Sequence, residues 1–279
     1  MGISPESNKS HYLYIFMKIL TQSKSLLLGC AIALTSIAAN AAEPVDICPD
    51  AASRTFIHNQ LETLLKQVQA SSDKNGGFGF NMWATVVNRA GVVCAVAKSG
   101  ADSGEQWPGS RVISAQKANT ANSFSLPDFA LSTANLYSAV QPGGTLFGLQ
   151  ESNPVDTSVA YAGDAAAYGT ANDPMVGKKI GGVNVFGGGL PLYDVNGALL
   201  GAVGVSGDSS CADHNIAWRM RQDANMDHVP GGVTANKDDN IIYDIDPTTS
   251  KSKDGWGHPS CSNAAKTIAE GFAKAGSGS

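Results

Sequence analysis

The first regular pattern in the chain is a run of apolar residues spaced three or four positions apart between residues 51 and 70. This spacing predicts an amphipathic helix. The residues that form its apolar face are Ile57, Leu61, Leu64, Leu65 and Val68. Asp50 stands directly before the run and is a candidate N-cap, and Asn75-Gly76-Gly77 ends the pattern.

Two pairs of apolar, β-rich runs follow, and each pair is joined by a turn sequence. Residues 83–87 and 92–97 flank Asn88-Arg89-Ala90-Gly91, which predicts one hairpin. Residues 186–193 and 198–207 flank a second turn that ends in Asn196-Gly197, a pair suited to positive φ. Strands that form as hairpins predict an antiparallel sheet.

Helical segments separate and follow these hairpins. A helix over 111–123, with Ser110 as a candidate cap, has a face of small residues. Further helices are expected at about 128–139, 212–225 and 264–275, with a short strand at 146–150. The expected helix-capping residue before 212–225 is Asp208 or Ser209. Helices that alternate with hairpins indicate an α+β domain.

Two segments have no clear period. Residues 151–180 are irregular and rich in Ala, Gly and Asn, and a loop of this length inside a domain is often functional. Residues 229–258 are rich in Gly, Asp, Lys, Ser and Thr, which predicts an exposed extension.

Glycines are concentrated in the second hairpin. Gly201 and Gly204 interrupt an otherwise apolar strand, which indicates close approach of another backbone. The alanine face of the 111–121 helix could account for both. Gly187, Gly188 and Gly189 are expected at the rim, beyond that helix, and are therefore the better candidates for contact with a ligand.

The N-terminal region predicts export. Lys18 and Lys24 precede a short apolar run, and small residues then lead to Ala39-Asn40-Ala41. This order is typical of a secretory signal peptide, and the run is too short to span a membrane. We expect upstream residues and a Sec signal peptide over 1–41, one domain over 42–226 and a loop-rich extension with a terminal helix over 227–279. The expected location is the periplasm or the exterior.

Cleavage after Ala41 would remove Cys30 and leave an even number of cysteines. They are Cys48, Cys94, Cys211 and Cys261. In an exported chain this predicts two disulfides, with three pairings possible. We favour the pairing of chain neighbours, Cys48 with Cys94 and Cys211 with Cys261.

Composition and motifs exclude several functions. A net charge of −5 with 15% charged residues gives no electrostatic footprint for nucleic acid. The chain lacks the H-E-x-x-H, G-x-S-x-G and C-x-x-C-H patterns, and its triple glycine lies between strands rather than before a helix. A dinucleotide site is therefore disfavoured, and an enzyme is less well supported than a binding protein.

Few side chains remain as candidates for ligand chemistry. His214 lies near the start of a helix and could ligate a metal or haem iron, or cap that helix. Arg111 and Lys117 could bind carboxylates or phosphates, or form a solvated face. His58 is expected at the edge of the core, and His228 and His258 are expected to be solvated in the extension.

Three segments, in this order, resemble the GlcG/HbpS family and the related C-terminal domain of PduO-type proteins. They are Arg111-Val112-Ile113-Ser114-Ala115-Gln116-Lys117-Ala118-Asn119-Thr120-Ala121, Phe186-Gly187-Gly188-Gly189-Leu190-Pro191-Leu192 and Gly201-Ala202-Val203-Gly204-Val205-Ser206-Gly207. The resemblance covers about 55–225. It implies a profilin-like fold with a five-stranded antiparallel sheet flanked by helices, assembly as a homo-oligomer, and haem or a related tetrapyrrole as ligand. The matching positions are Arg111, Ser114, Lys117, Thr120 and Gly187 to Gly189.

The resulting hypothesis is an exported haem-binding protein. Lys117 and Arg111 would meet the haem propionates, and His214 or Thr120 would approach the iron. The alternatives are a periplasmic sensory or binding module for another small molecule, and a haem-modifying enzyme. The irregular segment 151–180 and the extension depart from the family pattern, and either could cover the family's ligand surface.

Overall fold

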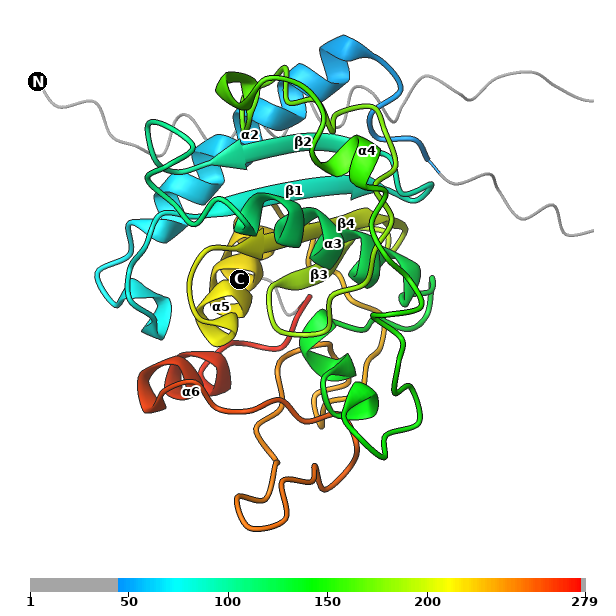
Figure 1. Cartoon of the computed structure of the whole chain (residues 1–279). Coiled ribbons are helices and arrows are strands. Elements are labelled where there is room, and N and C mark those ends of the chain that lie inside the picture. The colour runs from blue at the N-terminus through cyan, green and yellow to red at the C-terminus, as the bar shows by residue number, and fades with distance from the viewer. Residues whose placement is uncertain (1–44, 277–279) are drawn as a thin grey trace, which may run out of the picture. The chain divides into compact units, whose positions relative to one another are not determined.

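A computed structural model describes residues 45–276, and the predicted signal peptide lies outside this part of the chain. Within it a sheet has four antiparallel strands in the order β2-β1-β4-β3 (Figure 1). The strands are β1 (Trp83–Asn88), β2 (Val93–Lys98), β3 (Gly189–Tyr193) and β4 (Leu199–Ser206). The expected α+β class is confirmed, but the sheet of the described residues has four strands and not five.

Helices cover both faces of this sheet. Helix α3 (Ser110–Ser123) packs against β1, β3 and β4 and crosses in front of them in Figure 1. Helices α2 (Ala51–Gln69) and α5 (Ser210–Asp223) pack on the other face and contact each other. Helix α6 (Asn263–Glu270) packs against α5. Asp50 and Ser209 cap α2 and α5 as predicted.

The strands are buried on both faces, which explains their continuous apolar sequences. Along β1, Trp83 and Val87 point into the core beneath α3, whereas Ala84 and Val86 point into the core formed with α2 and α5. Thr85 lies on the α3 side, where its hydroxyl is 2.7 Å from that of Ser114. The alternation of side chains therefore separates two hydrophobic cores.

Three local predictions are wrong. Residues 128–139 form two short 3₁₀ helices, Thr133–Leu136 and Ser138–Val140, and 146–150 is a series of turns rather than a strand. The backbone of the first segment bonds elsewhere, because Ala130 N–H donates to the Gly231 carbonyl. Ser110 is the first residue of α3 and does not cap it, since Gly109 occupies the N-cap position.

The two irregular segments are packed onto the domain. Residues 151–180 contain the short helix α4 (Thr157–Ala160) and a 3₁₀ turn, Ala165–Ala167. Beyond α5, residues 227–276 contact α5 through the Arg221–Asp239 ion pair and the 133–140 region through a Ser138–Gly257 hydrogen bond, and they include α6 (Figure 1). Asp239 of this extension is fully buried, so the extension is only partly exposed.

Both expected disulfides are present with the favoured pairing. Cys48 is bonded to Cys94, and Cys211 is bonded to Cys261. The first joins the segment before α2 to β2, and both of its cysteines are buried. The second joins the start of α5 to the extension, and its Cys261 is exposed.

Candidate functional site

The three consecutive glycines, here called the glycine loop, are buried: Gly187 and Gly188 precede β3, and Gly189 is its first residue. A Cβ atom on Gly187 would collide with the Ser210 carbonyl oxygen of α5. On Gly189 it would lie 2.5 Å from the Lys117 carbonyl oxygen of α3 and 2.5 Å from Thr133. Gly188 also has a positive φ of 121°. The expectation that helices do not reach these glycines is therefore wrong, because α3 and α5 both touch them.

The two glycines of β4 approach different partners. A Cβ on Gly204 would collide with the Ser114 carbonyl of α3, so the small-faced helix does explain this glycine. A Cβ on Gly201 would instead collide with the Val87 carbonyl of β1. Gly201 thus allows close strand pairing at a φ of 153°, and the helix does not account for it.

Lys117 reaches across the sheet from α3 to the start of α5. Its ammonium donates to Asp213 Oδ2 at 2.7 Å and to the Val205 carbonyl at 3.0 Å, and it lies 5.0 Å from the centre of the Phe186 ring. Burial raises the pKa of the Asp213 carboxyl to about 6, against the opposing effect of Lys117. Burial also lowers the pKa of Lys117, although Asp213 opposes this. The buried pair ties α3, β4 and α5 together directly beneath the glycine loop.

Arg111 forms a second buried ion pair, about 1.7 turns earlier on α3. Its Nε donates to Asp173 at 2.8 Å, and its guanidinium lies 3.6 Å from the centre of the Tyr168 ring. Asp173 also accepts backbone N–H bonds from Gly169 and Met175, so this carboxylate organises the 151–180 segment. The solvated face considered for Arg111 and Lys117 is excluded, because their exposed fractions are 2% and 0%.

The remaining predicted residues of α3 hold neighbouring backbone. The Thr120 hydroxyl donates to the Gln116 carbonyl and accepts from Asn184 N–H at 2.9 Å. Ser114 faces Thr85, as described above. The structure thus places Arg111, Ser114, Lys117 and Thr120 in the interior, where protein groups satisfy them.

His214 lies on α5 against the glycine loop, with its Cβ 3.0 Å from the position of a Cβ on Gly187. Its Nε2 lies 3.2 Å from Asn240 Oδ1, which also accepts from Ile241 N–H at 2.8 Å. Ile241 N–H also donates to His214 Nε2 at 3.2 Å, so Nε2 faces both a donor and an acceptor. Among the described residues, the buried Nδ1 has no hydrogen-bond partner. Burial lowers the pKa of His214 to about 3, so the ring is neutral.

His258 was expected to be solvated, and this prediction is wrong. It is 2% exposed, its Nδ1 lies 2.7 Å from the Pro259 carbonyl, and its Nε2 accepts from Gly187 N–H at 3.3 Å. Burial lowers its pKa to about 4. Thr133 was also missed: its hydroxyl donates to the Phe186 carbonyl and accepts from Gly189 N–H. No periodic signal in the sequence marks either residue as a partner of the glycine loop.

The other histidines are unremarkable. His58 is 6% exposed and bonds through Nδ1 to the Val96 carbonyl at 3.0 Å, which agrees with its expected place at the edge of the core. His228 is half-buried, and its Nε2 lies 3.1 Å from Asn225.

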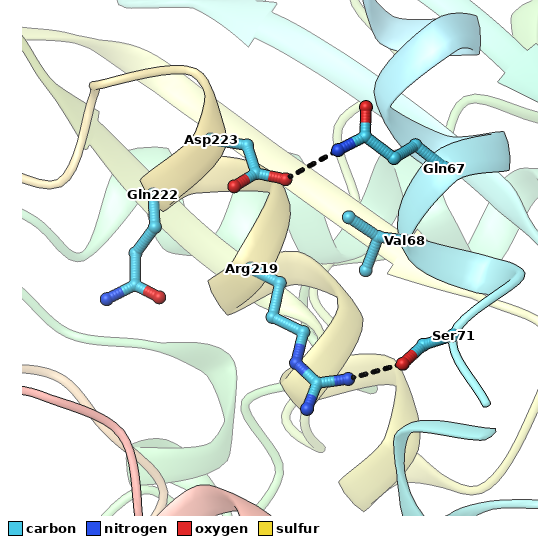
Figure 2. Close-up of a pocket in the computed structure, with 6 residues that line it drawn as sticks. All are labelled: Gln67, Val68, Ser71, Arg219, Gln222 and Asp223. Atoms are coloured by element: carbon cyan, nitrogen blue, oxygen red, sulfur yellow. Dashed lines mark hydrogen bonds between the residues drawn. The ribbon is translucent and has the colours of Figure 1, made fainter. Parts of the chain in front are cut away.

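A shallow hollow of about 260 Å³ lies elsewhere, between the end of α2 and α5 (Figure 2). Its lining residues are Gln67, Val68, Ser71, Arg219, Gln222 and Asp223. Polar side chains cross it, since Gln67 bonds to Asp223 and Arg219 bonds to Ser71 (Figure 2). Arg219 also forms an ion pair with Asp73. None of the residues predicted for ligand binding lines this hollow.

Residues 45–276 contain neither a candidate metal-ion cluster nor a helix that could span a membrane. No cluster of three His, Cys, Asp or Glu side chains in this range is arranged to hold a bare metal ion. None of the helices in the same range has the length and apolar character needed to cross a membrane.

Comparison with known proteins agrees with the resemblance noted in the sequence. The model of the family described as "Haem degrading protein HbpS-like" matches residues 56–221, more than half of the chain. No curated protein matches the chain.

Several solved structures are similar. Klebsiella pneumoniae protein ORFY is 24% identical, with 65% of this chain and 93% of that chain covered and a TM-score of 0.40. A PduOC:heme complex is 20% identical, with coverages of 63% and 94% and a TM-score of 0.39. A double mutant of Streptomyces reticuli HbpS is 15% identical, with coverages of 69% and 97% and a TM-score of 0.36. On the family match, the chain belongs to the HbpS-like family of haem-degrading proteins.

Proposed function

We propose that this protein binds haem or another tetrapyrrole. Membership of the HbpS-like family supports this function, and one solved relative is described as a complex with haem. The observation in this chain that carries the proposal is His214. It presents a neutral imidazole beside the glycine loop, and its buried Nδ1 has no hydrogen-bond partner among the described residues. Neutral imidazole nitrogen is a common ligand of haem iron.

The His214 imidazole is suited to bind haem iron, but in this arrangement of the chain there is no room for a haem beside the glycine loop. Protein atoms from α3, α5 and Thr133 fill the positions next to Gly187, Gly188 and Gly189. Arg111 and Lys117 already have carboxylate partners. Contact of these residues with propionates, and of Thr120 or Ser114 with the ligand, stays a prediction. The proposal rests on His214, and haem, if bound there, would supply the iron.

A haem titration of the purified protein tests the proposal. We expect a saturable shift of the Soret band that weakens by about tenfold in affinity in His214→Ala, the scale of losing one ligand interaction. His228→Ala is the matched control because this half-buried histidine lies away from the glycine loop. Absence of a shift in every form of the protein would reject tetrapyrrole binding. Stabilisation by some other metabolite would then favour the alternative binding module.

We also propose that the protein is exported and acts in the periplasm or outside the cell. Two disulfides within one chain support this location, because disulfides persist in oxidising compartments. Assembly as a homo-oligomer stays a prediction, and light scattering of the purified protein would test it. A haem-modifying activity is the alternative enzymatic function, and product formed from bound haem and a reductant would support it.

A further inference from the structure

The C-terminal extension lies directly over the candidate site. Ile241 N–H and Asn240 Oδ1 both lie 3.2 Å from His214 Nε2, and His258 accepts from Gly187 N–H. One segment of chain therefore contacts the two features that the ligand proposal needs. The family match ends at residue 221, so this segment lies outside the part of the chain that defines the family.

An ion pair, a hydrogen bond and a disulfide hold the extension over the site. Arg221 forms a buried ion pair with Asp239, with Nη1 to Oδ2 at 2.7 Å and Nη2 to Oδ1 at 2.8 Å. The Ser138 hydroxyl donates to the Gly257 carbonyl at 2.6 Å. The covalent link is the Cys211–Cys261 disulfide, which joins the first turn of α5 to the chain just beyond His258.

The two disulfides differ in accessibility. Both residues of Cys48–Cys94 are 0% exposed, whereas Cys261 is an exposed residue. Cys211 lies in the first turn of the 14-residue helix α5, and its Sγ accepts from Cys261 N–H at 3.1 Å. A thiolate at such a position is stabilised by the helix N-terminus, and a stabilised thiolate leaves faster in disulfide exchange.

We propose that the Cys211–Cys261 disulfide is a thiol-exchange site that locks residues 227–276 as a cover over His214 and the glycine loop, and that its reduction by a dithiol releases the cover. A thiolate of the dithiol attacks Cys261 Sγ. The S–S bond breaks, and its electron pair passes to Cys211 Sγ.

The second thiol of the reagent then displaces Cys261 from the mixed disulfide. The dithiol leaves as an oxidised disulfide, and its two protons end on Cys211 and Cys261. The benefit of release for ligand binding rests on the proposed function, but the release itself does not.

The experiment uses the full chain, oxidised or treated briefly with dithiothreitol. Alkylation followed by peptide mass analysis identifies the reduced cysteines, and hydrogen exchange reports the amides of Gly187 and Ile241. We expect alkylation at Cys211 and Cys261 while Cys48 and Cys94 stay bonded. Exchange at the two amides should rise by about tenfold or more, as in local opening.

A C211S/C261S variant should show the same fast exchange without reductant, and a C48S/C94S variant should keep the cover closed until reduced. Equal reduction of both disulfides, or unchanged exchange in the reduced native protein, would overturn the proposal. Because native protein is measured, a variant that fails to fold leaves this test intact.

Haem titration of the same samples separates the two proposals. Tighter haem binding after reduction supports both. Faster exchange without haem binding in any sample supports the cover and rejects tetrapyrrole binding. Equal haem affinity before and after reduction, with His214 required, supports tetrapyrrole binding and overturns the cover as a gate.

Discussion

Acidification should destabilise this protein through His214 and His258. Both rings are buried and neutral, with pKa values lowered by burial to about 3 and about 4 from an ordinary value of 6.5. Below pH 6.5 the unfolded chain takes up two protons that the folded chain does not. The stability that these histidines contribute is therefore fully present above pH 6.5 and is lost as the pH falls.

The size of the effect follows from proton linkage. Each pH unit below 6.5 costs about 1.4 kcal/mol per histidine, so at pH 5 the two together cost about 4 kcal/mol. Asp213 acts in the opposite direction, because its folded pKa of about 6 lies above its ordinary value of 3.8. Its contribution grows as the pH falls below 6 and returns about 1.4 kcal/mol at pH 5. A net loss of about 2 to 3 kcal/mol should remain.

The assay is urea unfolding of the wild type, His258→Gln and His228→Gln at about pH 7 and pH 5. A glutamine amide oxygen can still accept from Gly187 N–H but takes up no proton. The His258→Gln variant should therefore lose about 2 kcal/mol less than the wild type between these pH values. His228→Gln, at a half-buried position, should behave as the wild type. Equal losses in the wild type and His258→Gln would refute the reasoning.

Two further predictions concern packing and charge. Gly204→Ala should destabilise the fold by about 3 kcal/mol, because the added methyl meets the Ser114 carbonyl. The control Gly109→Ala has no atom within 4 Å of the new Cβ and should change stability by less than about 0.5 kcal/mol. Thermal unfolding measures both variants, and equal effects would contradict the close approach of α3. Lys117→Met should lower the free energy of unfolding by about 3–5 kcal/mol, because it leaves the Asp213 carboxyl buried without its ammonium partner. Adding Asp213→Leu should recover part of this loss, as measured by urea unfolding. A double variant less stable than Lys117→Met would contradict the pairing.

Local signals in the sequence were sufficient for the elements with strong patterns. The helical spacing after Asp50 predicted α2, and the Asn196-Gly197 turn predicted the β3–β4 hairpin. An even number of cysteines after the expected cleavage predicted both disulfides. The helix predicted over 128–139 is absent, and Ala130 N–H of this segment donates to the Gly231 carbonyl of the extension, a long-range bond that local propensity does not record.

At the candidate site, too, the sequence predicted some residues and missed others. The sequence identified Gly187, Lys117 and His214 as candidates for contact with a ligand, because backbone without Cβ atoms and charges amid small residues are visible in the residue order. It did not place His258 beside Gly187, since these residues are 71 positions apart and the contact exists only after the extension folds back.

The sequence by itself left three disulfide pairings open, and the structure has the one that we favoured. The sequence did determine helices α2, α3, α5 and α6, the two hairpins and the resemblance to the family. These depend on residue periodicity, turn chemistry and motif order, all of which act over short stretches. Only the tertiary structure decided that Arg111 and Lys117 are buried ion pairs, that α3 and α5 fill the space beside the glycines, and that the extension covers His214. Burial and long-range partners set the charge state and accessibility of a side chain, and neither is encoded in its near neighbours.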